Sequence, residues 1–128
     1  MKKFTALAIL LSFIMVGFMA CSKSSGSTTT NLDTGSKQAQ SAMTINFTAT
    51  QTGDGSITTL TYTVGSTTQT VSNPSLPWSK SVDASSGDYV SIKATAVTTN
   101  GSVTITYDGQ NSTDHISGKD SVSTSSTK

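Results

Sequence analysis

Apolar and polar residues alternate with a period of two over much of the chain, beginning near Met43. In the first such stretch Met43, Ile45, Phe47 and Ala49 fall on one face, and the residues between them are Thr or Asn. Successive side chains of a β-strand point to opposite faces, so this pattern is typical of a strand with one buried side. The sequence therefore predicts that an ordered β domain begins at about residue 43.

Similar alternation recurs in five further stretches, which are separated by Gly, Asp, Asn and Ser. They cover residues 57–64, 67–72, 78–83, 89–97 and 103–107. Six short strands without a helical period predict an all-β fold, a small antiparallel immunoglobulin-like sandwich, with a small closed barrel as the alternative. A seventh strand around Ile116 or Val122 stays open. The predicted sandwich covers residues 43–118, and a disordered tail is expected at 119–128.

Three dipeptides containing glycine predict turns between these strands. Asp54-Gly55 and Asn100-Gly101 are typical of β-hairpins, so each predicts that the two flanking strands pair with each other. Asp108-Gly109 predicts a third turn.

The stretch Asn73–Lys80 holds both prolines and the only tryptophan of the chain. Proline cannot donate to a sheet ladder and tryptophan is the largest apolar side chain, so Pro77-Trp78 predicts the entry to a strand whose indole ring fills the core. With the inward positions of the other strands, the predicted structural core consists of Leu60, Tyr62, Trp78, Val90, Ile92, Val103 and Ile105.

The first 20 residues have the three parts of an export signal: Lys2-Lys3, an apolar run from Phe4 to Met19, and Ala20 before Cys21. The arrangement resembles a bacterial lipoprotein signal peptide at residues 1–20, which implies cleavage before Cys21 and acylation of that cysteine with diacylglycerol and palmitate-type chains. Such chains attach a protein stably to a membrane. Residues 21–42 are rich in Ser and Thr, and we expect them to form a flexible tether.

Composition narrows the function classes further. Ser and Thr together number 47, while Arg and Glu are absent. The formal net charge of +1 includes Lys2 and Lys3, so the chain without its leader carries one net negative charge and no basic cluster. Nucleic acid is therefore not an expected partner. Because Cys21 is the only cysteine, an internal disulfide cannot form.

No set of residues predicts catalysis, a cofactor or a metal site. His115, the only histidine, lies in a polar segment without a nucleophile motif, so we expect a solvated side chain and no enzyme activity. The oxygen-rich stretch 108–114 could be imagined as a calcium loop, but it lacks regular ligand spacing and is predicted to be a turn. Tyrosine and tryptophan could stack on a sugar, although a core role is favoured.

Several segments resemble the mycobacterial membrane protein S (MmpS) family. They are Leu60-Thr61-Tyr62-Thr63-Val64, Thr68–Asn73, Leu76-Pro77-Trp78-Ser79-Lys80, Tyr89–Ile92 and Gly101–Gly109. The resemblance implies a small β-sandwich outside the inner membrane that serves as an accessory to an RND-type exporter. That family is anchored by a transmembrane helix, whereas this chain has a lipoprotein-type signal.

The residues and the resemblance together lead to two functional hypotheses. The first is a non-enzymatic, lipid-anchored envelope lipoprotein that assists an RND-type transporter or another membrane complex. The alternative is a surface-exposed structural, ligand-binding or glycan-binding lipoprotein. Ser22 after the cysteine resembles the pattern for outer-membrane delivery, at either the periplasmic face or the cell surface.

Overall fold

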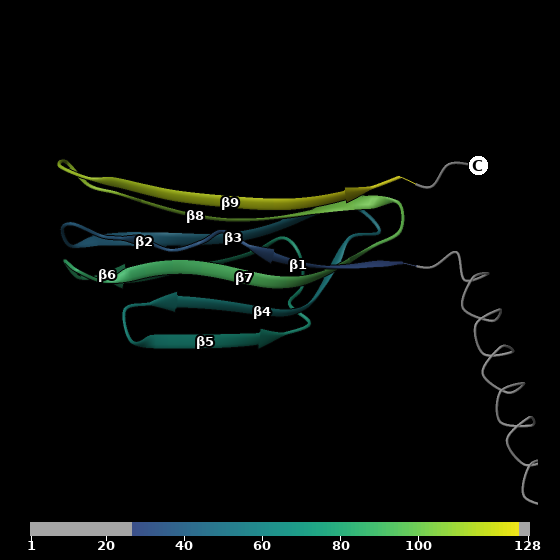
Figure 1. The fold of residues 1–128 in the computed structure, drawn as a ribbon, viewed down its shortest axis with the longest axis horizontal. Helices are drawn as coiled ribbons and strands as arrows, with labels where there is room; N and C mark the ends of the chain where they lie inside the picture. The colour runs from purple at the N-terminus through teal and green to yellow at the C-terminus, as the bar shows by residue number, and fades with distance from the viewer. Residues whose placement is uncertain (1–26, 126–128) are drawn as a thin grey trace, which may run out of the picture.

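The computed structural model describes residues 27–125, which form two antiparallel sheets packed face to face (Figure 1). One sheet has the order β1-β7-β4-β5, with β2 also paired to β7, and the other has the order β6-β3-β8-β9. The strands in this part of the chain are β1 (Thr28–Asp33), β2 (Lys37–Gln38), β3 (Met43–Gly53), β4 (Ser56–Val64), β5 (Thr67–Ser72), β6 (Trp78–Ala84), β7 (Tyr89–Thr98), β8 (Gly101–Gln110) and β9 (His115–Thr124).

The predicted all-β antiparallel sandwich is confirmed, and the alternative of a closed barrel is wrong because the strands form two separate sheets. The number of strands was underestimated. Nine strands lie within residues 27–125 instead of six or seven. The additional ones come from both ends of the described chain, where alternation of apolar residues is weakest.

Both predicted hairpins are wrong, because each dipeptide connects one sheet to the other. Asp54-Gly55 joins β3 to β4, and residues 99–100 join β7 to β8, yet neither pair of strands shares a sheet. The two connections lie side by side, since Gly53 pairs with Gly101. Tight-turn dipeptides signal a reversal of the chain, but they do not determine whether the returning strand pairs with its predecessor or crosses the core.

The carboxylate of Asp54 fastens the two connections together. Its Oδ1 accepts hydrogen bonds from the backbone N–H groups of Thr99 at 3.0 Å and Asn100 at 2.9 Å. The Asn100 N–H also donates to Oδ2 at 3.0 Å. These N–H groups, Thr99 foremost, lower the pKa of Asp54 below its ordinary value of 3.8.

We expect replacement of Asp54 by Asn to remove part of the acid sensitivity of the fold. Because the pKa is lowered in the folded state, the ionised carboxylate contributes stability above the ordinary value of 3.8, and this contribution is lost as the pH falls through the folded-state pKa. Urea unfolding near neutral pH and at about pH 3 should therefore show a smaller loss of stability in Asp54→Asn than in the parent. Equal losses in the two proteins would contradict the role assigned to this carboxylate.

The predicted tether at 21–42 is wrong from Thr28 onward. Strand β1 pairs with β7 from Thr28↔Thr98 to Asp33↔Lys93, and β2 continues along the same neighbour. Leu32 and Ala39 are buried in the core. The segment adds its backbone hydrogen bonds to an existing strand and buries two side chains, so ordering it does not require a core of its own.

The predicted tail at 119–128 is also wrong up to Thr124, because β9 pairs with β8 over its whole length. Asp108-Gly109 is not a turn but part of β8. A Cβ atom at Gly109 would overlap the Ile45 and Met43 side chains, so the absence of a side chain explains the residue. The reversal falls a few residues later, where the Asn111 N–H donates to the Asp114 carbonyl at 2.9 Å.

The centre of the core is occupied by residues from β3 and β8. Phe47 and Tyr107 are the largest fully buried side chains and lie opposite each other in adjacent strands. The Phe47 ring packs against Tyr62 from the other sheet, with centroids 5.0 Å apart. Trp78 differs from the sequence prediction, because it is only half-buried and covers the outer end of this aromatic row, 5.7 Å from Tyr62.

The threonines of the outward faces form hydroxyl contacts across neighbouring strands. Thr61 and Thr63 of β4 meet Thr70 at 3.3 Å and Thr68 at 3.1 Å in β5. In the other sheet Thr48 bonds with Thr106. Cross-strand pairs of this kind contribute roughly 0.2–1 kcal/mol each, which makes Thr a suitable residue on a solvated strand face.

Candidate functional site

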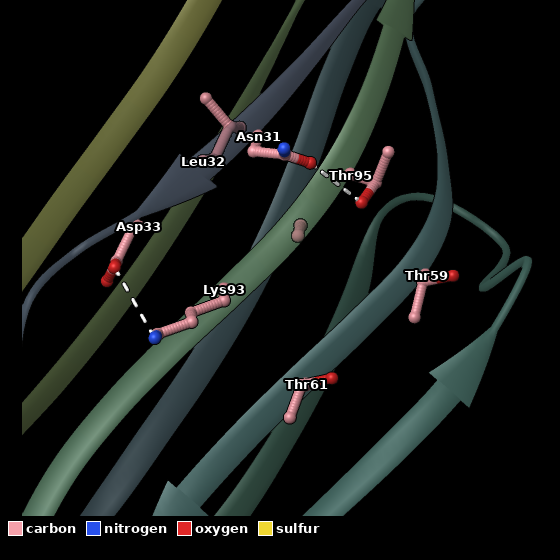
Figure 2. Close-up of a pocket in the computed structure, with 8 residues that line it drawn as sticks. Asn31, Leu32, Asp33, Thr59, Thr61, Lys93 and Thr95 are labelled. Carbon is pink, nitrogen blue, oxygen red and sulfur yellow. Dashed lines mark hydrogen bonds and ion pairs between the residues drawn. The ribbon is translucent and has the colours of Figure 1, made fainter.

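A shallow groove of about 320 Å³ lies over β1, β7 and β4 on the sheet that contains them. Figure 2 shows the side chains that line it, which come from neighbouring positions on the three strands. They are Asn31, Leu32, Asp33, Thr59, Thr61, Lys93, Ala94 and Thr95.

One hydrogen bond and one ion pair join the polar side chains along one wall of this groove (Figure 2). The Thr95 hydroxyl donates to Asn31 Oδ1 at 3.1 Å, and Lys93 Nζ lies 3.5 Å from Asp33 Oδ2. Both charged side chains are more than half exposed, at 61% and 52%, so the ion pair adds little to stability. The groove offers donors and acceptors to a partner but brings no nucleophile together with a base.

A second cavity of about 580 Å³ lies where the β1–β2 connection passes β9. Its lining comes from that connection, from β2, and from β8 and β9: Thr34, Lys37, Thr106, Tyr107, Asp108, Ser117, Gly118 and Lys119. Hydrogen bonds join the two elements on either side of it. The Asp33 N–H donates to Asp120 Oδ2 at 2.8 Å, and the Gln40 N–H donates to Asp114 Oδ2 at 2.9 Å.

The polar residues of the β8–β9 turn are engaged in hydrogen bonds within the protein. Asn111 Oδ1 accepts from the Thr113 and Asp114 N–H groups, both at 2.8 Å. His115 Nε2 lies 2.7 Å from Asp108 Oδ1 at an exposed position. Between residues 27 and 125, no three side chains of His, Cys, Asp or Glu lie together in a way that could hold a metal ion.

The residues singled out from the sequence differ in how deeply they are buried, and one of them lies outside the described residues. Cys21, the predicted lipidation site, lies outside the described residues. Leu60, Val90, Ile92, Val103 and Ile105 are fully buried, Tyr62 is 9% exposed and Trp78 is half-buried. Asn31 and Asp33 of the groove were not predicted as site residues, because the segment that carries them, now strand β1, was expected to be a tether. Leu32, an isolated apolar residue in this polar segment, was the one feature of the sequence that could have indicated a buried strand there.

Comparisons with known proteins assign no family. No family model matches the chain, and no curated protein or solved structure shows a significant match. The part of the chain from 27 to 125 contains no helix that is long and apolar enough to cross a membrane.

Proposed function

We propose that the chain is a non-enzymatic, lipid-anchored lipoprotein of the bacterial cell envelope that acts as an accessory to a membrane complex, such as an RND-type transporter. The membrane attachment would be the acylated Cys21. The transporter is the partner that the resemblance to the MmpS family implies, and the attachment follows from the signal at residues 1–20.

The position at which β1 begins supports this proposal, because it would keep the sandwich closer to the membrane than a long flexible tether would. Thr28 lies seven positions after Cys21 and is already paired with Thr98. A fully extended chain spans at most about 3.6 Å per residue, so the sandwich would lie within about 25 Å of the acylated cysteine. A tether through residue 42 would have allowed about 75 Å. A domain held this close can readily meet proteins of the same membrane.

A connection of only seven positions between Cys21 and Thr28 would also favour one orientation of the sandwich. Thr28 lies at the same end as the two connections that Asp54 joins, since Thr28 pairs with Thr98 and Gly53 pairs with Gly101. That end would face the membrane, and the turns at 85–88 and 111–114 would point away (Figure 1). The strands then run roughly along the membrane normal, and the groove over β1, β7 and β4 faces sideways toward neighbouring proteins.

Site-specific photo-cross-linking in intact cells tests the proposal. Thr59 lines the groove and Lys80 lies on β6 of the other sheet, and both are exposed, so they form a matched pair of positions for a photoreactive residue. We expect position 59 to cross-link to an integral membrane protein and position 80 to give much less product. The Cys21→Ser variant, which cannot be acylated, should lose the product at position 59.

Two outcomes would contradict the proposed accessory role. One is equal cross-linking from positions 59 and 80, which would indicate random encounters. The other is full cross-linking by the Cys21→Ser variant. Inserting a flexible segment of about 20 residues before Thr28 offers a further check, because the effective concentration of the domain near its partner should fall.

One observation favours the alternative of a glycan-binding lipoprotein. Tyr89 is 55% exposed, and among the described residues it is the exposed large hydrophobic side chain. It begins β7 at the end of the sandwich that would point away from the membrane. Stacking of sugar on this ring would predict loss of glycan binding in Tyr89→Ala, and access of protease to the domain on intact cells would accompany it.

A further inference from the structure

Strand β5 forms an open edge of its sheet (Figure 1). It pairs with β4 on one side, and no strand within residues 27–125 pairs with its other side. The opposite end of the sandwich differs, because hydrogen bonds from the Asp33 and Gln40 N–H groups join the β1–β2 segment to Asp120 and Asp114. The free edge of β5 exposes backbone N–H and C=O groups that can pair with a strand of another chain.

The register of the hairpin shows which backbone groups of β5 are free. A two-residue turn at 65–66 joins β4 to β5, so Val64 and Thr67 form a hydrogen-bonded pair, and every second residue from Thr67 onward bonds to β4. The Asn73 N–H continues this order, because it donates to the Thr58 carbonyl at 2.8 Å. The backbone groups that point away from β4 therefore belong to Thr68, Thr70 and Ser72.

Strand β5 also lacks the features that usually protect an open edge. Its sequence, TTQTVS, contains no charge, proline or glycine. The open edge of the other sheet is β6, which begins directly after Pro77 and carries Lys80 and Asp83. Charged residues and proline hinder the pairing of an edge strand with another chain. Strand addition is therefore favoured at β5 over β6.

The exposure of β5 determines which kind of strand fits beside it. Five of its six residues are exposed, and only Val71 is half-buried. A strand added to its free side would lie beyond the core, so both faces of that strand would meet solvent, and large apolar side chains on either face would stay in water. A fitting partner is uncharged, rich in β-branched residues and polar on both faces. Strand β5 has this composition itself.

We propose that β5 pairs antiparallel with β5 of a second copy of this chain, about a two-fold axis at Thr70. Thr70 then meets the partner's Thr70, and Thr68 meets the partner's Ser72, so all the outward backbone groups of both strands form hydrogen-bonded pairs. The threonine hydroxyl contacts between β4 and β5 would continue across the new pair. The two-fold symmetry closes both edges and limits the assembly to a dimer.

Two properties of this dimer follow from its geometry. A pair of six-residue strands that are exposed on both faces buries less than the roughly 1,200 Å² of a stable interface, so the dimer should be weak. Antiparallel pairing also turns one copy end over end. In the membrane orientation proposed above, it would join copies that are attached to two facing membranes, but the pairing itself requires neither the anchor nor the groove.

Sedimentation of the intact chain in detergent over a dilution series tests the pairing, with micelles in excess over protein. We expect a concentration-dependent dimer. Thr70→Pro removes an N–H that points away from β4 and should weaken the dimer by about tenfold or more. Thr70→Val is the matched control. It loses the same hydroxyl but keeps the N–H and the β-branched shape, so its dimer should be as strong as that of the parent.

Disulfide trapping provides a second measurement that does not depend on the folding of Thr70→Pro. In the Cys21→Ser chain, Thr70→Cys places two cysteines in a hydrogen-bonded pair with Cα atoms about 5.5 Å apart, which a disulfide can bridge. Thr50→Cys, exposed on the central strand β3, is the control. We expect mild oxidation to yield covalent dimer from position 70 and much less from position 50.

Three results would overturn the pairing through β5. The first is a parent chain that stays monomeric at every concentration. The second is a folded Thr70→Pro variant that dimerises as strongly as Thr70→Val. The third is equal disulfide formation from positions 70 and 50, which would indicate random collisions. Failure of the photo-cross-linking test above would leave these measurements unaffected, because they are made on the purified chain.

Discussion

Replacement of Phe47 by Ala should lower the free energy of unfolding by about 3–5 kcal/mol, the largest effect we expect from a single truncation in this chain. Phe47 is fully buried, lies opposite Tyr107 in the neighbouring strand and packs against Tyr62 of the facing sheet. Removal of the ring leaves a cavity between the two sheets, because the ring packs against side chains of both. Urea denaturation of the purified chain, monitored by Trp78 fluorescence, measures the change.

Trp78→Ala is the informative comparison for this prediction. The indole is larger than the phenyl ring but only half-buried at the edge of the core, so we expect a loss of roughly 1–3 kcal/mol, measured by circular dichroism because the fluorophore is absent. A greater loss for Trp78→Ala than for Phe47→Ala would show that the indole, and not Phe47, is the centre of the core.

Gly53→Ala should be the most damaging substitution outside the core, with a loss of about 2–5 kcal/mol. Gly53 has a φ of +57°, where an L side chain is strained, and a Cβ there would overlap the Asn100 carbonyl oxygen. The Asn100 oxygen and the next nearest atom, the Gly101 Cα at 3.0 Å, both belong to the backbone, so no side chain can move aside. The two connections between the sheets would have to separate, and the hydrogen bonds from Thr99 and Asn100 to Asp54 would weaken.

Gly35→Ala provides a matched control for that substitution. Gly35 also has a positive φ, +71°, but no atom lies within 4 Å of the position that a Cβ would take. We expect Gly35→Ala to lower the free energy of unfolding only by the cost of a left-handed backbone at an L residue, roughly 1–2 kcal/mol. If Gly53→Ala and Gly35→Ala destabilise the chain equally in thermal unfolding, the close packing of the two connections contributes nothing.

The alternation of apolar residues was sufficient to predict the six strands β3 to β8, and the buried face of β3, β4, β7 and β8. Ile45 and Phe47, Leu60 and Tyr62, or Val103 and Ile105 cannot all be buried unless the chain is extended with a period of two. The outward threonines reinforced this, because a β-branched hydroxyl side chain suits a solvated strand face. The class of fold was therefore determined locally, residue by residue.

The alternation of apolar residues could not determine which strands pair with each other. The strands that follow Asp54-Gly55 and Asn100-Gly101 could bury the same apolar faces either beside the preceding strand or across the core from it. The choice depends on contacts between segments far apart in sequence, such as Gly53 with Gly101 and Asp54 with Thr99. The groove depends on the same long-range arrangement, so it could not be found from local patterns.

The sequence by itself determined an extended β domain with one buried face per strand and no internal disulfide, because the period of the side chains and the number of cysteines are properties of the chain alone. The tertiary structure decided where the domain begins. Leu32 and its polar neighbours cannot fold alone. They become ordered because their backbone pairs with β7 and the Leu32 side chain is buried in the core. A polar segment gains order when a neighbouring strand satisfies its backbone hydrogen bonds, and the residues of β7 that pair with β1 lie 60 to 70 positions further along the chain.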